Sequence, residues 1–232
     1  MILRWRSAVT GLALVFAGCG GGGSGVAELE PAPRPSPGSV ADMATARTIV
    51  LQQDDMPATW RGAAHSDDPN EKARARQISA CLGRPDPETT RSAIVYGPDL
   101  SLDQSQVSSI ATVLNTVEDA RADLAAVQGP KYGACVIAAL KEDLQRQAPE
   151  ATIQDATAEP LPVAAFGDVS VGLRLTANLV YPDRTDRLFA DLVYITKDRS
   201  TVSVTFFSFN QPFPSTLEQS LVSRVGHRIA TA

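Results

Sequence analysis

The sequence predicts an α+β domain in which one antiparallel β-sheet packs against helices. Residues 171–180 alternate apolar and polar side chains, which is the pattern of a strand with one buried face. Residues 188–196 and 201–209 are apolar on both parities and are joined by a tight turn, which predicts a central hairpin covered on both faces. Helical stripes before and after these strands supply the covering layers.

The N-terminus predicts export. Arg4 and Arg6 precede an apolar run from Ala8 to Ala17, which is too short to span a bilayer as a mature helix, and small residues follow it. The ending Ala-Gly-Cys resembles a bacterial lipobox, although Phe16 stands where an aliphatic residue is usual. Cys19 is therefore the predicted lipidation site, and a plain signal peptide with a stray cysteine is the alternative.

Three segments are expected. Residues 1–18 form the signal peptide, residues 19–40 a Gly- and Pro-rich linker that begins at the lipidated cysteine, and residues 41–232 one globular domain. Loss of the signal changes the net charge from −5 to −7. A net negative charge argues against nucleic acid as a partner. It also argues against electrostatic attachment to anionic lipid, so we expect the acyl chains to hold the protein on the cell membrane from the extracytoplasmic side.

Cys81 and Cys135 remain for the folded domain. In an exported chain they are expected to form a disulfide. The alternative is a catalytic thiol, which would need a partner histidine. Both cysteines fall in predicted helices, over 70–82 and 132–147.

The remaining elements follow from periodicity and from turn residues. Further helices are predicted over 41–53 and from Thr116, where Asp119 completes a variant of the capping box. Strands are predicted over 92–96 and 107–114. A last helix is expected to begin with a capping box of Ser215 and Glu218 and to bury a stripe of Leu217, Leu221, Val225 and Ile229.

The order of these features resembles a family of actinobacterial exported domains. The matching pieces are Asp54-Asp55-Met56-Pro57 with Trp60, Cys81-Leu82-Gly83, the helix 117–127, Cys135, and the terminal hairpin with its helix. The family includes the extracytoplasmic sensor domain of a mycobacterial serine/threonine kinase and many anchored lipoproteins. The resemblance implies an α/β core braced by disulfides and a sensor-like role; this chain has one cysteine pair for the domain.

No catalytic constellation is visible. The chain lacks a nucleophile elbow, a His-Glu-x-x-His pair, a phosphate loop and a dinucleotide fingerprint. His65 and His227 are expected at the surface or at a helix end. The acidic pairs 54–55 and 67–68 lack the spacing of a calcium loop. We therefore expect no catalytic residue, no metal site and no cofactor.

The leading hypothesis is a non-catalytic, lipid-anchored envelope domain that binds a small or lipidic ligand or an envelope protein. A cleft between sheet and helices is expected along 171–179, 188–196 and 201–209. The candidate cleft residues are Trp60, Leu175, Tyr194 and Phe206. An envelope hydrolase or transferase with an unrecognised site is one alternative, and a structural interaction protein without a pocket is another.

Overall fold

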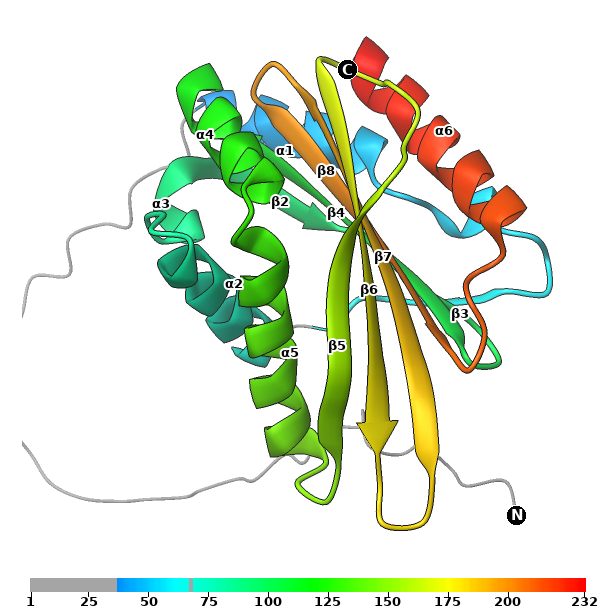
Figure 1. The fold of residues 1–232 in the computed structure, drawn as a ribbon. Coiled ribbons are helices and arrows are strands. Elements are labelled where there is room, and N and C mark those ends of the chain that lie inside the picture. The colour runs from blue at the N-terminus through cyan, green and yellow to red at the C-terminus, as the bar shows by residue number, and fades with distance from the viewer. Residues whose placement is uncertain (1–36, 67–68) are drawn as a thin grey trace, which may run out of the picture. The chain divides into compact units, whose positions relative to one another are not determined.

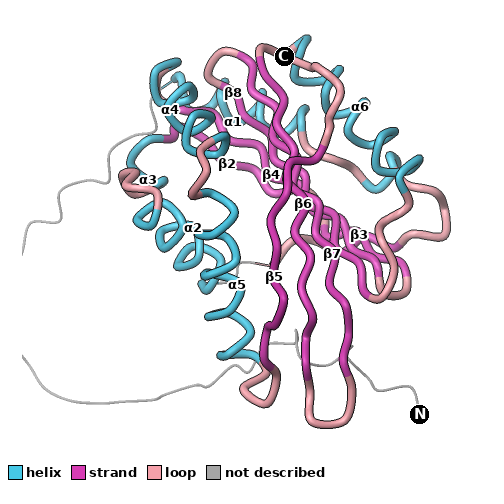
Figure 2. The backbone as a smooth tube through the Cα atoms, viewed as in Figure 1, coloured by secondary structure: helices cyan, strands magenta, loops and turns pink. Residues whose placement is uncertain are grey.

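A computed structural model describes residues 37–66 and 69–232. Within them the chain forms six α-helices and one eight-stranded sheet whose strands pair in antiparallel fashion (Figures 1 and 2). The predicted α+β class is therefore confirmed. The signal peptide, Cys19 and most of the linker lie outside the described residues.

The sheet has the order β1-β3-β4-β8-β7-β6-β5, and β2 pairs with β4 beside β3. Neighbouring pairs β3–β4, β5–β6, β6–β7 and β7–β8 are consecutive along the chain. The strands are β1 (Arg61–Ala63), β2 (Arg91–Tyr96), β3 (Asp99–Leu102), β4 (Ser105–Leu114), β5 (Thr152–Leu161), β6 (Val169–Val180), β7 (Thr185–Lys197) and β8 (Ser200–Phe209).

Helices cover both faces of the sheet (Figure 1). The first and last helices, α1 (Pro37–Ile49) and α6 (Ser215–Thr231), pack on one face and contact each other. The opposite face carries α2 (Pro69–Cys81), the single turn α3 (Pro87–Thr90), α4 (Val117–Gln128) and α5 (Tyr132–Gln147). The cavities beneath α2 and α3 lie on this second face.

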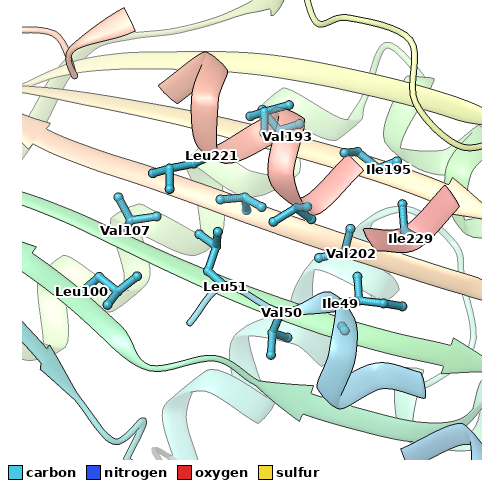
Figure 3. Close-up of a cluster of buried hydrophobic side chains, with 14 of the residues drawn as sticks. Ile49, Val50, Leu51, Leu100, Val107, Val193, Ile195, Val202, Leu221 and Ile229 are labelled. Atoms are coloured by element: carbon cyan, nitrogen blue, oxygen red, sulfur yellow. The ribbon is translucent and has the colours of Figure 1, made fainter. Parts of the chain in front are cut away.

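The main core lies between the sheet and the α1–α6 layer. Figure 3 shows Leu221 and Ile229 of α6 in one cluster with Val193, Ile195 and Val202 of the central hairpin. The alternate side chains of β7 and β8 pack under α5 instead, in two smaller apolar clusters. The prediction that this hairpin is central and covered on both faces is confirmed.

The Asp-Asp-Met-Pro segment anchors α6. Asp55 is buried at the end of a short 3-10 helix (η2, Gln53–Asp55), and its carboxylate accepts hydrogen bonds from Arg228 at 2.6 and 2.8 Å. The backbone amide of Gln52 also donates to this carboxylate, at 2.7 Å. Burial alone would raise the pKa of Asp55, but these donors hold it below its usual value. The segment therefore ties the end of α1 to the last helix.

Four segments named here differ from the prediction. Helix α1 begins at Pro37, which is a favoured first helical residue, and ends at Ile49 rather than at Gln53. Strand β5 was not predicted, because its side chains are mostly exposed and polar, and because Pro160 argues against a central strand; β5 is an edge strand. The short strands β1 and β3 were also missed.

The two predicted helix caps had different outcomes. Thr116 is the N-cap of α4, and its hydroxyl accepts the backbone N–H of Asp119 at 3.0 Å, as predicted. The capping box of Ser215 and Glu218 is wrong. Pro214 takes the cap position of α6 without a side-chain bond, and Glu218 is buried against the sheet instead.

Candidate ligand groove

The floor of the groove is formed by four neighbouring strands. Strand register places two cross-strand rows next to each other on the face that carries α2. One row is Ile94, Thr112, Thr201 and Thr196, and the next is Tyr96, Ile110, Ser203 and Tyr194. Four adjacent strands span roughly 15 Å across the sheet, so the floor is long enough for an extended ligand.

Helix α2 forms the roof, and its sequence explains why a space remains beneath it. Of its thirteen residues only Ile78 is a large aliphatic, and the rest are charged, polar or small. An α-helix normally packs on a sheet through an apolar stripe, which α2 lacks. The helix is held through its neighbours instead, so side chains do not fill the gap between it and the sheet.

Covalent and ionic contacts fix α2 to α5. Cys81 in the last turn of α2 is joined by a disulfide to Cys135 of α5, with 5.8 Å between the two Cα atoms. Arg74 forms an ion pair with the buried carboxylate of Asp143. A third link runs from the Gln77 amide, which donates to Glu142 at 2.6 Å. These links lie along the α5 side of α2 and set its position.

The start of α2 is held by His65. The imidazole stacks on the Tyr96 ring at 4.4 Å, and its two nitrogens lie 2.9 Å from Glu71 and 3.2 Å from Asp99. Burial alone would lower the pKa of His65, but the two carboxylates raise it above 6.5. His65 was expected to be an ordinary surface or helix-end residue; the structure makes it a half-buried bridge between α2 and β3.

Two adjoining cavities of about 200 and 190 Å³ lie beneath α2 and α3. The larger extends under α4 and reaches Tyr132 and Tyr194, and the smaller opens toward Glu71 and Tyr96. They form one groove, because five residues line both: Pro87, Arg91, Ile110, Thr112 and Ser203. Sites for drug-sized ligands hold roughly 300–1,000 Å³, so the two cavities together fall near the lower end of that range.

Neutral hydroxyl groups face the larger cavity. The phenols of Tyr132 and Tyr194 are hydrogen-bonded to each other, and burial raises the pKa of both, so both stay protonated. Because that bond uses only one of the two O–H groups, one phenolic donor remains. On the floor, the hydroxyls of Thr112 and Ser203 have no hydrogen-bond partner among the described residues.

A titratable cluster of catalytic type exists, but on the opposite face. Glu218 of α6 lies beside Asp191 of β7, which forms an ion pair with Arg174 of β6. Burial, and then the charge of Asp191, raise the pKa of Glu218 from 4.5 to about 7. None of these three residues lines either cavity, so this acid pair cannot act on a ligand in the groove.

The structure separates the four predicted cleft residues. Trp60 and Phe206 are buried in the core under α1 and α6, where both rings pack against Phe213. Leu175 is buried with the apolar cluster under α5. Only Tyr194 lines the groove. The predicted segments 188–196 and 201–209 contribute to its floor, whereas 171–179 does not.

Sequence reasoning missed most of the groove. It did not single out Thr112, Ser203 or α2, although a signal was present in the alternation of β4. There the buried Val107, Ala111 and Val113 face the core, and Ile110 and Thr112 face the other side. A mixed apolar and hydroxyl face is unusual for a strand that a helix covers, and it marks the floor.

Two further properties hold for residues 37–66 and 69–232. No helix in these ranges has the length and apolar character needed to cross a membrane. The same ranges hold no cluster of three or more His, Cys, Asp or Glu side chains placed to bind a metal ion.

Comparison with known proteins gave structural likenesses alone. No protein-family model and no curated protein matches the chain. The extracellular domain of PknH from Mycobacterium tuberculosis aligns with 82% of this chain and 97% of its own, at 11% identity and a TM-score of 0.40.

Two other solved structures are similar at the same level. An uncharacterised protein from Mycobacterium smegmatis aligns with 79% of this chain and 96% of its own, at 11% identity and a TM-score of 0.39. LpqN of M. tuberculosis, described as involved in cell envelope biogenesis, aligns with 76% of this chain and 85% of its own, at 10% identity and a TM-score of 0.29. We draw no functional conclusion from likenesses of this size.

Proposed function

We propose that this chain is a non-catalytic, lipid-anchored domain of the cell envelope that binds a small or lipidic ligand in the groove beneath α2. The observation that carries the proposal is the pair of adjoining cavities on a mixed apolar and hydroxyl floor, under a helix held by a disulfide. A groove kept open by fixed elements is already organised for binding, so a ligand pays little for ordering it.

Binding without catalysis is supported by where the reactive groups lie. Catalysis requires a nucleophile or an acid–base group with a tuned pKa at the bound substrate. Glu218, the carboxyl group whose pKa is raised to about 7, is on the other face of the sheet. The two described cysteines form a disulfide, which leaves neither as a thiol nucleophile.

Lipid anchoring is supported by the residues Ala-Gly-Cys at positions 17–19, which close the N-terminal apolar run. Changing Cys19 to Ser should leave the precursor unprocessed or release the protein from membranes, as measured by cell fractionation and by the mass of the N-terminal peptide. Normal cleavage with retention of the Cys19→Ser protein in the membrane fraction would contradict the anchor.

Ligand binding is tested by native mass spectrometry of the protein purified from its own host. We expect an adduct on the wild-type chain and its loss in Ser203→Phe, because Ser203 lines both cavities and a phenyl ring there fills the space between them. Thr205→Phe is the matched control, since Thr205 lies on the same strand and face but outside the groove lining. A wild-type protein without adduct, or an adduct that survives Ser203→Phe, would contradict the site.

A further inference from the structure

We infer that the groove is built for an uncharged amphiphile, a molecule with a neutral, oxygen-bearing head and an apolar tail. This inference rests on the proposed function, because it names the ligand class of the same groove. It follows from three features of the lining: a rim whose charges are balanced, a floor with unused hydroxyl groups, and apolar walls at one end.

The rim carries equal numbers of opposite charges. Among the described residues that line the two cavities, four are cationic and four are anionic. The cations are Lys72, Arg76, Arg84 and Arg91, and the anions are Glu71, Asp86, Glu88 and Asp123. The lining therefore presents no net charge to a ligand at neutral pH.

Each of these charges already has a partner. Arg84 pairs with Asp123 at 2.8 Å, and Arg76 lies 3.0 Å from both Asp86 and Glu88. Glu88 also lies 3.4 Å from Arg91. The two remaining groups are paired as well: Lys72 is 3.9 Å from Glu88, and Glu71 is 2.9 Å from His65.

This pairing disfavours a charged ligand. A phosphate or carboxylate head that binds one of these cations would compete with the carboxylate beside it, and a cationic head would compete in the same way for the carboxylates. Either head would also lose hydration in the groove, which is costly without a full set of new partners.

Neutral polar groups of a ligand, in contrast, can form hydrogen bonds with hydroxyl groups on the floor. Thr112 and Ser203 have no hydrogen-bond partner among the described residues, and each hydroxyl both donates and accepts. The Tyr132–Tyr194 pair keeps one phenolic donor. Alcohol, ether and carbonyl oxygens match this set without any change in charge.

The apolar tail of the ligand would bind to a separate, aliphatic part of the groove. Aliphatic side chains from α2, the turn after it, β4 and α4 line the larger cavity together with the hydroxyl rows: Ile78, Leu82, Leu114, Leu124 and Val127. Burial of an alkyl chain against these side chains removes apolar surface from water and favours binding. The groove thus offers an apolar surface and neutral hydrogen-bonding groups to one ligand.

The experiment compares amphiphiles that share one tail. Octyl β-D-glucoside, octyl phosphate and octyltrimethylammonium are titrated into the full chain below their micelle concentrations, and each dissociation constant is measured by calorimetry. We expect the glucoside to bind at least ten-fold more tightly than either charged probe. Equal binding of the three, or preference for a charged head, would overturn the inference while leaving ligand binding intact.

Failure of the proposed function gives a different result. If none of the three probes binds and the host-purified chain carries no adduct, both proposals fall. If none binds but an adduct is present, the groove binds another class of ligand and only this inference falls.

Two variants test the roles of the hydroxyls. Thr112→Val and Ser203→Ala should each weaken glucoside binding about five-fold, the effect of one lost neutral hydrogen bond. Thr205→Val, outside the groove on the same strand face, should leave it unchanged. Unaltered affinity in both groove variants would contradict the assigned hydrogen-bonding floor.

A gain-of-function variant tests the role of the paired charges. Asp123→Asn keeps the size of the side chain but removes the partner of Arg84. The freed guanidinium should then bind an anionic head, so the affinity for octyl phosphate should rise several-fold. No gain for octyl phosphate would show that charge pairing does not exclude anions.

Discussion

Replacing Glu218 by Gln should stabilise the domain at pH 8 and leave it unchanged at pH 5. In the folded protein the Glu218 carboxyl lies next to Asp191, and its pKa is raised from 4.5 to about 7 by burial and by that neighbour. When protonated, Glu218 donates a hydrogen bond to the Asp191 carboxylate. A glutamine amide donates in the same way and does not ionise.

The sign and size follow from linkage. Because the pKa of Glu218 is higher in the folded than in the unfolded chain, the stability that it contributes is complete below pH 4.5 and is lost as the pH rises through about 7. A pKa difference of this size has a ceiling of about 3 kcal/mol. Since the Arg174 side chain in the same cluster is 37% exposed, we expect screening to reduce the effect to about 1–2 kcal/mol.

Urea denaturation followed by circular dichroism measures this effect directly. From pH 5 to pH 8 the wild-type free energy of unfolding should fall by about 1–2 kcal/mol more than that of Glu218→Gln. The thermal midpoint at pH 8 should be about 4 °C higher in the variant. Glu118→Gln, an exposed site on α4, is the control. Parallel pH profiles for wild type and Glu218→Gln would refute the proposed ionisation of a buried carboxyl pair.

Three further outcomes are expected. Replacing both Cys81 and Cys135 by Ser should lower the free energy of unfolding by about 4 kcal/mol, because the unfolded chain regains the entropy of the closed loop. The same change should weaken ligand binding, because it releases α2. Two free thiols in the unreduced wild type would contradict the disulfide. Arg228→Ala should cost about 2–3 kcal/mol, because it leaves the Asp55 carboxylate buried without its main partner; a loss below 0.5 kcal/mol would contradict that role. The raised pKa of His65 adds stability that is complete below pH 6.5 and is lost as the pH rises through the pKa of His65 in the folded protein. His65→Phe should therefore remove this pH dependence from the free energy of unfolding. An unchanged pH dependence would contradict the assignment to His65.

The central hairpin and the last helix could be predicted because their patterns are set by burial. Strands β7 and β8 are apolar on both parities, since α1 and α6 cover one face and α5 the other. The stripe on α6 is equally clear, because Leu221, Val225 and Ile229 are all buried against the sheet. Strand β5 lacks such a pattern, because most of its side chains are exposed and burial therefore does not require apolar residues at regular positions.

The groove could not be predicted, because it depends on the register of strands that are far apart in the chain. Thr112 lies beside Thr201 only after β4 pairs with β8. The space above them exists because α2 lacks an apolar stripe, and no local pattern shows what that helix leaves unfilled. Aromatic residues are poor markers of the cleft in this chain, because Trp60 and Phe206 are buried in the core.

Isoleucine methyl groups offer the most direct test of the groove. The isoleucines divide between the two faces of the sheet, with Ile78, Ile94 and Ile110 lining the groove and Ile49, Ile195 and Ile229 in the core under α1 and α6. Methyl NMR spectra of the labelled chain are recorded while octyl β-D-glucoside is added. Ligand binding beneath α2 predicts saturable shifts at the three groove methyls and unchanged signals from the three core methyls. Shifts confined to the core methyls, or no saturable shift at the groove methyls, would contradict it.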